Sequence, residues 1–353
     1  MRKFRLLIIL FIVLPIGIVM AITFDQFIEN VADQIEENQT TELPKIESNQ
    51  TTKEFKELLK GDIFQLMNKT SSEIENELGK PIRKDLTPYG YTWWVYRNDT
   101  EFYLLVGIKD DYVETIFATG KDVASEPFSI GTSYNKIKKQ FPFKDKITYQ
   151  TGLSFYSFLL NEEDLKVNPL IELGDNLFIQ CYFDTFTDSL SSIRIATGDV
   201  LIRQRFYEME YRGTLPPEES LSEDEWKKIE KGMEEQIFEL TNILRDRFDL
   251  KPLAKDEEVS EVAFLHSKDM YENNYFSHYG LDGSGLKERL EEKQIFYLSA
   301  GENIAAQHTD APAAVEGWLN SEGHREALLN EGYTHLGVGV HRLYYTQNFI
   351  LKH

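Results

Sequence analysis

The chain has 353 residues, too many for one typical hydrophobic core, so at least two domains are expected. Its hydrophobic content of 41% and aromatic content of 13% are typical of globular domains and argue against a disordered protein. A net charge of −21 argues against nucleic acid as a partner and against broad attachment to anionic lipid. The single cysteine, Cys181, excludes internal disulfides and a cysteine-based zinc cluster, and we expect it to be buried in an aromatic-rich strand.

The N-terminus predicts export. Residues 1–22 combine the basic start Met1–Arg5 with the apolar run Leu6–Ile22, which is just long enough to span a bilayer. An uncleaved membrane anchor with the bulk of the chain outside is favoured, and a signal that is cleaved after export is the alternative. Residues 23–58 form an acidic linker that would hold the rest of the chain off the membrane. One cysteine in an exported chain fits a bacterial envelope protein better than a secreted eukaryotic one.

Residues 59–205 predict a domain of short helices and antiparallel strands that is duplicated internally. Each repeat begins with a helical stretch that is soon followed by proline, and each ends in Ala-Thr-Gly, at 118–120 and at 196–198. The helices are expected at Thr70–Leu78 and Tyr134–Phe141. The first repeat's strands are expected at Tyr91–Tyr96, Phe102–Ile108 and Tyr112–Phe117, with a turn at 97–100. An interaction or regulatory module and a plain scaffold are both compatible with this pattern.

A linker and helix start at 206–228 precede the last segment, 229–353, which predicts an α+β layered domain. Apolar residues at helical spacing predict three helices, then a fourth region broken at 321–323. Alternation at the C-terminus predicts strands of a closing antiparallel sheet. The expected elements are helices near Ser222–Asp249, Asp256–Asn273, Leu286–Ile295 and Ala313–Leu329, and strands at Leu336–Val340, Arg342–Tyr345 and Thr346–Leu351.

All seven histidines lie after position 265, so any chemistry of imidazole or carboxylate groups is expected in the last quarter of the chain. His266 falls on the apolar face of its predicted helix and is expected to be a core residue with one ring nitrogen satisfied. His308, His335 and His341 have no partner at metal-ligand spacing and are expected in loops or on the surface.

The motifs of this segment resemble the CAP superfamily, named after cysteine-rich secretory proteins, antigen 5 and pathogenesis-related 1 proteins and also called SCP-like. They follow the family's order over about residues 230–353, and are Phe238–Arg245, His266–Met270, Tyr275–His278, Gly301–Ala305, Trp318–Ser321, Gly323–Arg325 and Leu336–Gly339. The resemblance implies an α-β-α sandwich with a cleft over its central sheet. Residues 59–205 are similar to the CAP-associated N-terminal domain of exported bacterial proteins.

The resemblance also implies which residues lie in the cleft. His278 and His324 match the family's two histidines and Glu302 its first glutamate, so these three are the candidate catalytic residues. Ser321 stands where many members have a second glutamate, so the tetrad is incomplete. Glu316 and Glu322 are the nearest carboxyl substitutes. Some members bind a metal through the histidines, so His278 and His324 are the candidate ligands for zinc or another divalent cation.

Two imidazoles and a carboxylate could hold tetrahedral zinc with a water as fourth ligand, which is the basis of a metal-dependent hydrolase. They also have structural uses. Glu302 could accept a hydrogen bond from His278, Ser321 could cap the helix of His324, and Arg325 could pair with an acid across the fold. A binding module for an unknown envelope ligand or protein is therefore favoured over the hydrolase and over a purely structural spacer, with Ser321, Asn303 and Tyr275 as candidate ligand-binding residues.

Tyrosines recur at a spacing of four near His278. Tyr271, Tyr275 and Tyr279, with Phe276 and Tyr297, could line a wall for a sugar or a lipid, although core packing is the favoured interpretation. Asp282–Gly285 is expected to be a turn and not a phosphate-binding loop.

Overall fold

The computed structural model describes residues 62–98 and 102–352. The expected anchor at 1–22 and the linker at 23–58 therefore lie outside the described residues, as do residues 99 and 100 of the turn at 97–100. Within the described ranges, none of the helices has the length and apolar composition needed to cross a membrane.

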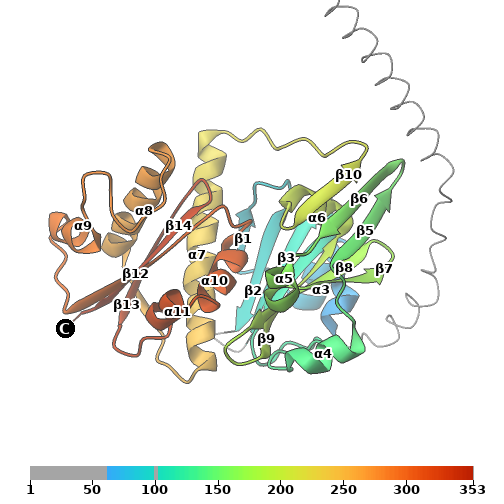
Figure 1. The fold of residues 1–353 in the computed structure, drawn as a ribbon, viewed down its shortest axis with the longest axis horizontal. Helices are drawn as coiled ribbons and strands as arrows, with labels where there is room; N and C mark the ends of the chain where they lie inside the picture. Colours follow the sequence, from blue (N-terminus) through green and yellow to red (C-terminus); the bar gives the residue numbers. More distant parts are fainter. Residues whose placement is uncertain (1–61, 99–101, 353) are drawn as a thin grey trace, which may run out of the picture. The chain divides into compact units, whose positions relative to one another are not determined.

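The N-terminal domain is built mainly from antiparallel strands (Figure 1). Its elements in chain order are η1 (Asp62–Leu66), α3 (Ser71–Leu78), β1 (Arg83–Leu86), β2 (Thr92–Asn98), β3 (Phe102–Lys109), β4 (Tyr112–Thr119), α4 (Tyr134–Gln140), β5 (Lys146–Thr151), β6 (Ser154–Leu159), α5 (Glu162–Val167), β7 (Leu170–Gly174), β8 (Leu177–Asp184), β9 (Ser189–Thr197), α6 (Gly198–Gln204) and β10 (Glu208–Arg212).

The large sheet of this domain places strands from the two predicted repeats side by side. Its strand order is β1-β2-β3-β4-β9-β8-β7, so the last strand of each repeat, β4 or β9, lies beside the other at the centre. The residue before each repeat's helix forms an isolated bridge to the start of that repeat's last strand, Thr70 with Tyr112 and Ser133 with Ser189. The second repeat additionally contains β5 and β6, which with β10 form a separate three-stranded sheet. Cys181 is fully buried in β8, as expected, and burial raises the pKa of its thiol.

The C-terminal domain contains α7 (Glu223–Arg247), β11 (Ala254–Lys255), α8 (Glu257–Glu272), α9 (Leu286–Glu292), β12 (Ser299–Ala306), α10 (Ala311–Leu319), α11 (Glu322–Leu328), β13 (His335–His341) and β14 (Tyr344–Leu351). Its sheet has the order β11-β13-β14-β12. Two expectations were wrong. The short strand β11 pairs parallel to β13, so the sheet is mixed, and Arg342 and Leu343 form a turn with positive φ, so the C-terminus contributes two strands and not three.

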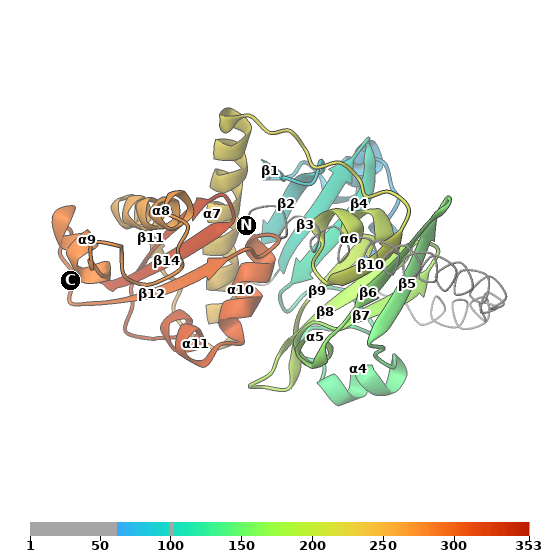
Figure 2. The ribbon, with the colours of Figure 1, turned by 45° about the horizontal axis from the view of Figure 1, so that its top comes forward.

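Helices cover both faces of this sheet, which confirms the predicted α-β-α sandwich (Figure 2). On β13, Gly337 and Gly339 face α8, and a Cβ on Gly339 would lie only 1.9 Å from the backbone nitrogen of Phe264. The residues that alternate with them, Leu336, Val338 and Val340, point to the opposite face and join the hydrophobic cluster that includes α7. The two faces of β13 thus differ in side-chain size because α8 packs directly on the backbone.

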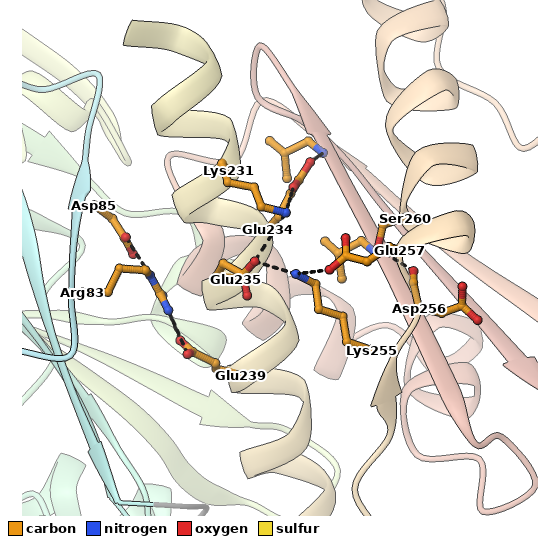
Figure 3. A network of polar contacts seen from close by, with 12 residues as sticks. Arg83, Asp85, Lys231, Glu234, Glu235, Glu239, Lys255, Asp256, Glu257 and Ser260 are labelled. Atoms are coloured by element: carbon orange, nitrogen blue, oxygen red, sulfur yellow. Dashed lines mark hydrogen bonds and ion pairs between the residues drawn. The ribbon is translucent and has the colours of Figure 1, made fainter. Parts of the chain in front are cut away.

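Helix α7 also contacts the N-terminal domain. Ser222 caps it through a capping box with Glu225, which explains why the helix begins where the sequence predicts. Arg83 of β1 forms two hydrogen bonds to Glu239 of α7, at 2.9 and 3.0 Å (Figure 3). Beside them, the amide of Gln236 donates to Asp85 at 2.8 Å. One helix therefore belongs to the cores of both domains.

The two domains share a hydrophobic core and several buried ion pairs. One apolar cluster runs from residues of the N-terminal sheet, such as Trp93 and Tyr182, to residues of α7 and α10, such as Ile237 and Trp318. Further contacts between the domains join Arg194 to Asp310, Arg325 to Asp184, Ser191 and Ser192 to Glu316, and Asn320 to Thr185. Because Arg194, Asp310, Asp184 and Glu316 are buried, each domain supplies polar partners for buried ionisable groups of the other.

Candidate functional site

His278 is held by its neighbours on both sides. It follows the end of α8, in a segment that turns at Asn274, where φ is 53°. Its Nδ1 lies 2.9 Å from Oε1 of Glu302, and its carbonyl oxygen accepts a hydrogen bond from Arg289 at 3.1 Å. Its side chain is nevertheless 48% exposed. Since the glutamate occupies Nδ1, the other ring nitrogen, Nε2, is the one that a ligand could reach.

Both carboxylate oxygens of Glu302 are engaged. Oε1 meets His278, and Oε2 accepts from Nη2 of Arg289 at 2.5 Å. The glutamate side chain is only 5% exposed, so the arginine compensates its charge where water cannot. The sequence did not indicate Arg289, because it lies on the short helix α9 and no motif connects it with a glutamate 13 residues later.

His324 approaches the same place from α11. Its ring centroid lies 6.4 Å from that of His278, with 48° between the ring planes. Burial and the neighbouring His278 both lower the pKa of His324. The ring is therefore neutral near pH 7 and offers a nitrogen lone pair.

The edge of the C-terminal sheet brings these groups together. Strand β12 is the last strand of the sheet, and its successive residues Glu302 and Asn303 point to opposite faces. Glu302 contacts His278 and Arg289, whereas the amide of Asn303 donates to the carbonyl oxygen of His324 at 3.0 Å. The side chains of two successive residues of this edge strand thus hold His278 and the backbone of His324.

The three candidate ligand-binding residues are placed differently. Asn303 is fully buried and donates to His324 and Gln347, so in this structure it positions the helix of His324. Ser321 is the residue at the start of α11 as expected, but its side chain makes no capping hydrogen bond. The hydroxyl of Tyr275 donates to Asp269, and its ring lies 6.5 Å from that of His266. His266 itself is a core residue whose Nε2 meets the carbonyl oxygen of Ser277 at 3.0 Å, as predicted.

The carboxyl group of Glu316 does not reach the histidines. It lies at the boundary between the domains, where Oε1 accepts from the hydroxyls of Ser191 and Ser192 at 2.9 and 2.6 Å. Burial is the main cause that raises its pKa from 4.5 to about 7, against the lowering effects of these hydroxyls and of Arg247. Glu322 is exposed in the first turn of α11. The predicted pairing of Arg325 with an acid is confirmed, since its two terminal nitrogens each lie 2.9 Å from an oxygen of Asp184.

The elevated pKa of Glu316 predicts how stability depends on pH. Between pH 4.5 and about 7 the folded state keeps the proton that the unfolded state loses, so the free energy of unfolding should fall as pH rises through this window. Glu316→Gln mimics the protonated group. We expect it to flatten this slope and to stabilise the protein by about 3 kcal/mol near pH 8, the equivalent of the pKa shift.

Urea unfolding at about pH 5 and about pH 8 measures both effects. Glu322→Gln is the matched control, because the same change on an exposed carboxyl should leave stability nearly unchanged. Equal pH slopes for Glu316→Gln and the unaltered protein would contradict the prediction.

Of the five aromatic residues that the sequence groups with His278, three are exposed, so core packing was the wrong interpretation for those three, whereas Tyr297 packs on the small hydrophobic cluster around Leu290. Tyr271, Phe276 and Tyr279 are 46%, 54% and 64% exposed. Phe296 and Leu298, which precede the strand of Glu302, are also exposed. The expectation for His341 was wrong as well, since its ring is enclosed by Phe264 and Tyr271 and lies 3.2 Å from Glu230. Asp282–Gly285 forms the expected turn, with Gly283 at φ 86°.

The site fits a metal ion only in part. A histidine that binds a metal through one ring nitrogen commonly donates a hydrogen bond from the other to a carboxylate, and His278 and Glu302 are arranged in this way. His278 and His324 would therefore be the residues that hold zinc or another divalent cation. Glu302, the expected third ligand, has both oxygens occupied. Within residues 62–98 and 102–352, no three His, Cys, Asp or Glu side chains gather in a way that could hold a metal ion.

Comparison with protein families assigns both domains. Residues 67–207 match the CAP-associated N-terminal family, and residues 238–352 match the cysteine-rich secretory protein family, CAP. The chain is 44% identical to the uncharacterized membrane protein YlbC of Bacillus subtilis over 290 residues, which are 82% of this chain and 84% of that protein. It is 40% identical to the uncharacterized protein YkwD of the same organism over 121 residues, 34% of this chain and 47% of that protein.

Solved structures share the arrangement of both domains. An extracellular protein with an SCP domain from Bacillus anthracis is 41% identical, with a TM-score of 0.79 over 82% of this chain and 95% of that one. A cysteine-rich secretory protein from Staphylococcus aureus is 25% identical, with a TM-score of 0.73 over 83% and 93%. The sequence resemblance is thereby confirmed, and the chain belongs to the CAP (cysteine-rich secretory protein) family, with a CAP-associated domain ahead of its CAP domain.

Proposed function

We propose that this protein is an extracytoplasmic binding module of the cell envelope and that its ligand binds at the partly exposed pair of His278 and His324. The engagement of Glu302 carries this proposal. A glutamate that serves as a general base or metal ligand needs a carboxylate oxygen for that role, whereas here one oxygen holds His278 and the other holds Arg289. The arrangement fixes a partly exposed imidazole in one orientation, which suits recognition.

The placement outside the cytoplasm rests on two kinds of support. The relative from Bacillus subtilis is named a membrane protein, and the structure from Bacillus anthracis is that of an extracellular protein. The basic and apolar pattern of residues 1–22 agrees with both names, and an uncleaved anchor there would keep the two domains at the outer face of the membrane.

A metal-dependent hydrolase is the second candidate, and the His278–Glu302 pair favours it. Zinc or another divalent cation held by His278 and His324 would supply a Lewis acid next to the cleft. In that reaction Glu302 and Arg289 would keep His278 in the tautomer that presents Nε2. The two candidates differ in a measurable way, because only the hydrolase turns over a substrate.

The test compares the full-length protein with the double variant His278→Ala and His324→Ala. With equimolar zinc and p-nitrophenyl acetate, we expect both proteins to release nitrophenolate at the same rate, because the Glu302 carboxylate is not free to assist. A thermal-shift screen against small molecules extracted from bacterial envelopes should instead yield a ligand that raises the Tm of the unaltered protein and not that of the double variant.

The control is His335→Ala, which removes an imidazole from β13 and leaves His278 and His324 in place. It should behave as the unaltered protein in both assays. If the unaltered protein and the control show zinc-dependent hydrolysis and the double variant does not, the hydrolase would be supported and the binding module rejected.

A further inference from the structure

A cavity lies where the two domains meet, and neither His278 nor His324 lines it. Its volume is about 380 Å³. The N-terminal domain contributes Tyr89 and Gln204 to its wall, and the CAP domain contributes Tyr271, Thr309 and Tyr344. Cavities that bind small molecules often lie between domains and have volumes of about 300–1,000 Å³.

Two polar atoms on residues of this wall are buried and have no hydrogen-bond partner among the described residues. They are Oε1 of Gln204 and the hydroxyl oxygen of Thr309, on residues that are 4% and 8% exposed. The rest of each residue is fixed, since the Gln204 amide nitrogen donates to the hydroxyl of Tyr91 at 2.9 Å and the Thr309 carbonyl oxygen accepts from Tyr89 at 2.7 Å. A buried acceptor without a partner costs free energy, so a ligand that donates to it would remove the penalty.

The same wall offers aromatic rings. Tyr271 is 46% exposed, and its ring lies 6.0 Å from that of Tyr344 at a steep angle. Tyr271 was one of the tyrosines that the sequence associated with His278, but the structure places it on this cavity. Rings beside polar atoms suit a ligand that has both apolar faces and hydroxyl groups.

The turn between β13 and β14 borders the cavity, and its two residues have a backbone conformation that is unfavourable for them. Arg342 and Leu343 have φ values of 48° and 64°, a conformation that two-residue hairpins normally assign to asparagine and glycine. Such backbone conformations in bulky residues cost stability and are concentrated at functional sites. Arg342 is compensated by Glu223 and stacks on Trp226, with 4.6 Å between its guanidinium carbon and the ring. Arg205, the other arginine of the wall, lies 3.4 Å from Glu218, so both arginines have a carboxylate partner and neither requires an anionic ligand.

We propose that this cavity binds a neutral saccharide of about two sugar rings, the size that its volume admits. A sugar hydroxyl would donate to Oε1 of Gln204, a second would exchange a hydrogen bond with Thr309, and the C–H face of a ring would pack on Tyr271. The site is separate from the cleft of His278 and His324 and does not rest on its function.

Titration of the full-length protein with three disaccharides, N,N′-diacetylchitobiose, cellobiose and maltose, tests this proposal. Trp226 lies next to the cavity wall through Arg342, so its fluorescence should report binding, with calorimetry as the second measurement. We expect at least one of the three to bind with a Kd of about 1 mM. The tripeptide Ala-Ala-Ala is the comparison ligand and should not bind.

Two variants locate the site. Thr309→Val removes the hydroxyl without breaking a hydrogen bond, so the fold should be intact while affinity falls about fivefold. Tyr271→Ala should lower affinity about tenfold through the lost ring contact. Tyr112→Ala is the matched control, an exposed tyrosine of β4 that is not part of the cavity wall, and it should bind as the unaltered protein.

Three results would overturn the proposal. The first is that none of the three disaccharides binds. The second is that the unaltered protein and both cavity variants bind the disaccharide with equal affinity. The third is that the tripeptide binds to the unaltered protein and that both cavity variants lose this binding. The last would identify a peptide site instead.

Discussion

Replacing Arg194 with methionine is expected to lower the free energy of unfolding by about 4 kcal/mol, because it leaves a buried carboxylate without its cation. Arg194 is fully buried in β9, and its guanidinium lies 2.9 and 2.7 Å from the two oxygens of Asp310. Asp310 is itself almost fully buried at the start of α10. The pair therefore connects the domains in a region that water does not reach.

The double variant Arg194→Met and Asp310→Asn distinguishes the net contribution of the ion pair to stability from the cost of leaving one buried charge unpaired. Asparagine keeps the hydrogen bond that caps α10, now accepted from Ala313, but it carries no charge. We expect the double variant to regain most of the stability that the single variant loses. Urea unfolding measures all three proteins, and a double variant as unstable as Arg194→Met would show that the arginine acts through packing.

The second large effect is expected for Gly339→Ala. The added Cβ would overlap the backbone of α8, with Phe264 nitrogen at 1.9 Å and Ala263 carbonyl carbon at 2.3 Å. Backbone atoms cannot rotate away as a flexible side chain can, so helix and sheet must separate. Overpacking of this kind costs about 3 kcal/mol or more.

Gly323→Ala is the matched control. A Cβ added to Gly323 would have no neighbouring atom within 4 Å, and the residue belongs to α11, so alanine should leave stability unchanged or raise it by up to about 1 kcal/mol. Both variants are compared by thermal and urea unfolding. A Gly339→Ala protein with unaltered Tm would contradict the close packing of α8 on β13.

Local patterns predicted most of the helices. The capping group at Ser222 and the apolar spacing of α7 and α8 act within a few residues, so the sequence reveals them directly. Strand β12 was missed because Ser299–Ala306 has no clear alternation and few β-branched residues. It is a strand because β14 pairs with it along its whole length. The proximity of His278, His324 and Glu302 was predicted through family motifs, because the order and spacing of these motifs reflect a known fold that composition and periodicity do not reveal.

Contacts between distant segments account for what the sequence could not predict. Arg289 reaches Glu302 because α9 packs near β12. Glu316 lies in a segment with helical spacing, and this spacing does not indicate that Ser191 and Ser192 of the other domain contact it. Such pairs depend on the three-dimensional arrangement of the two sheets and α7, which secondary-structure propensity and hydrophobic periodicity do not describe.

The shared core also determines what a protease could release from this protein. The segment between β10 and α7, from Gly213 to Leu221, is mostly exposed and is the chain's only covalent connection between the domains. Cleavage there would leave Arg194 paired with Asp310 and α7 packed on β1. The product would be a nicked complex of two chains, so shedding of a free CAP domain would require unfolding as well as cutting.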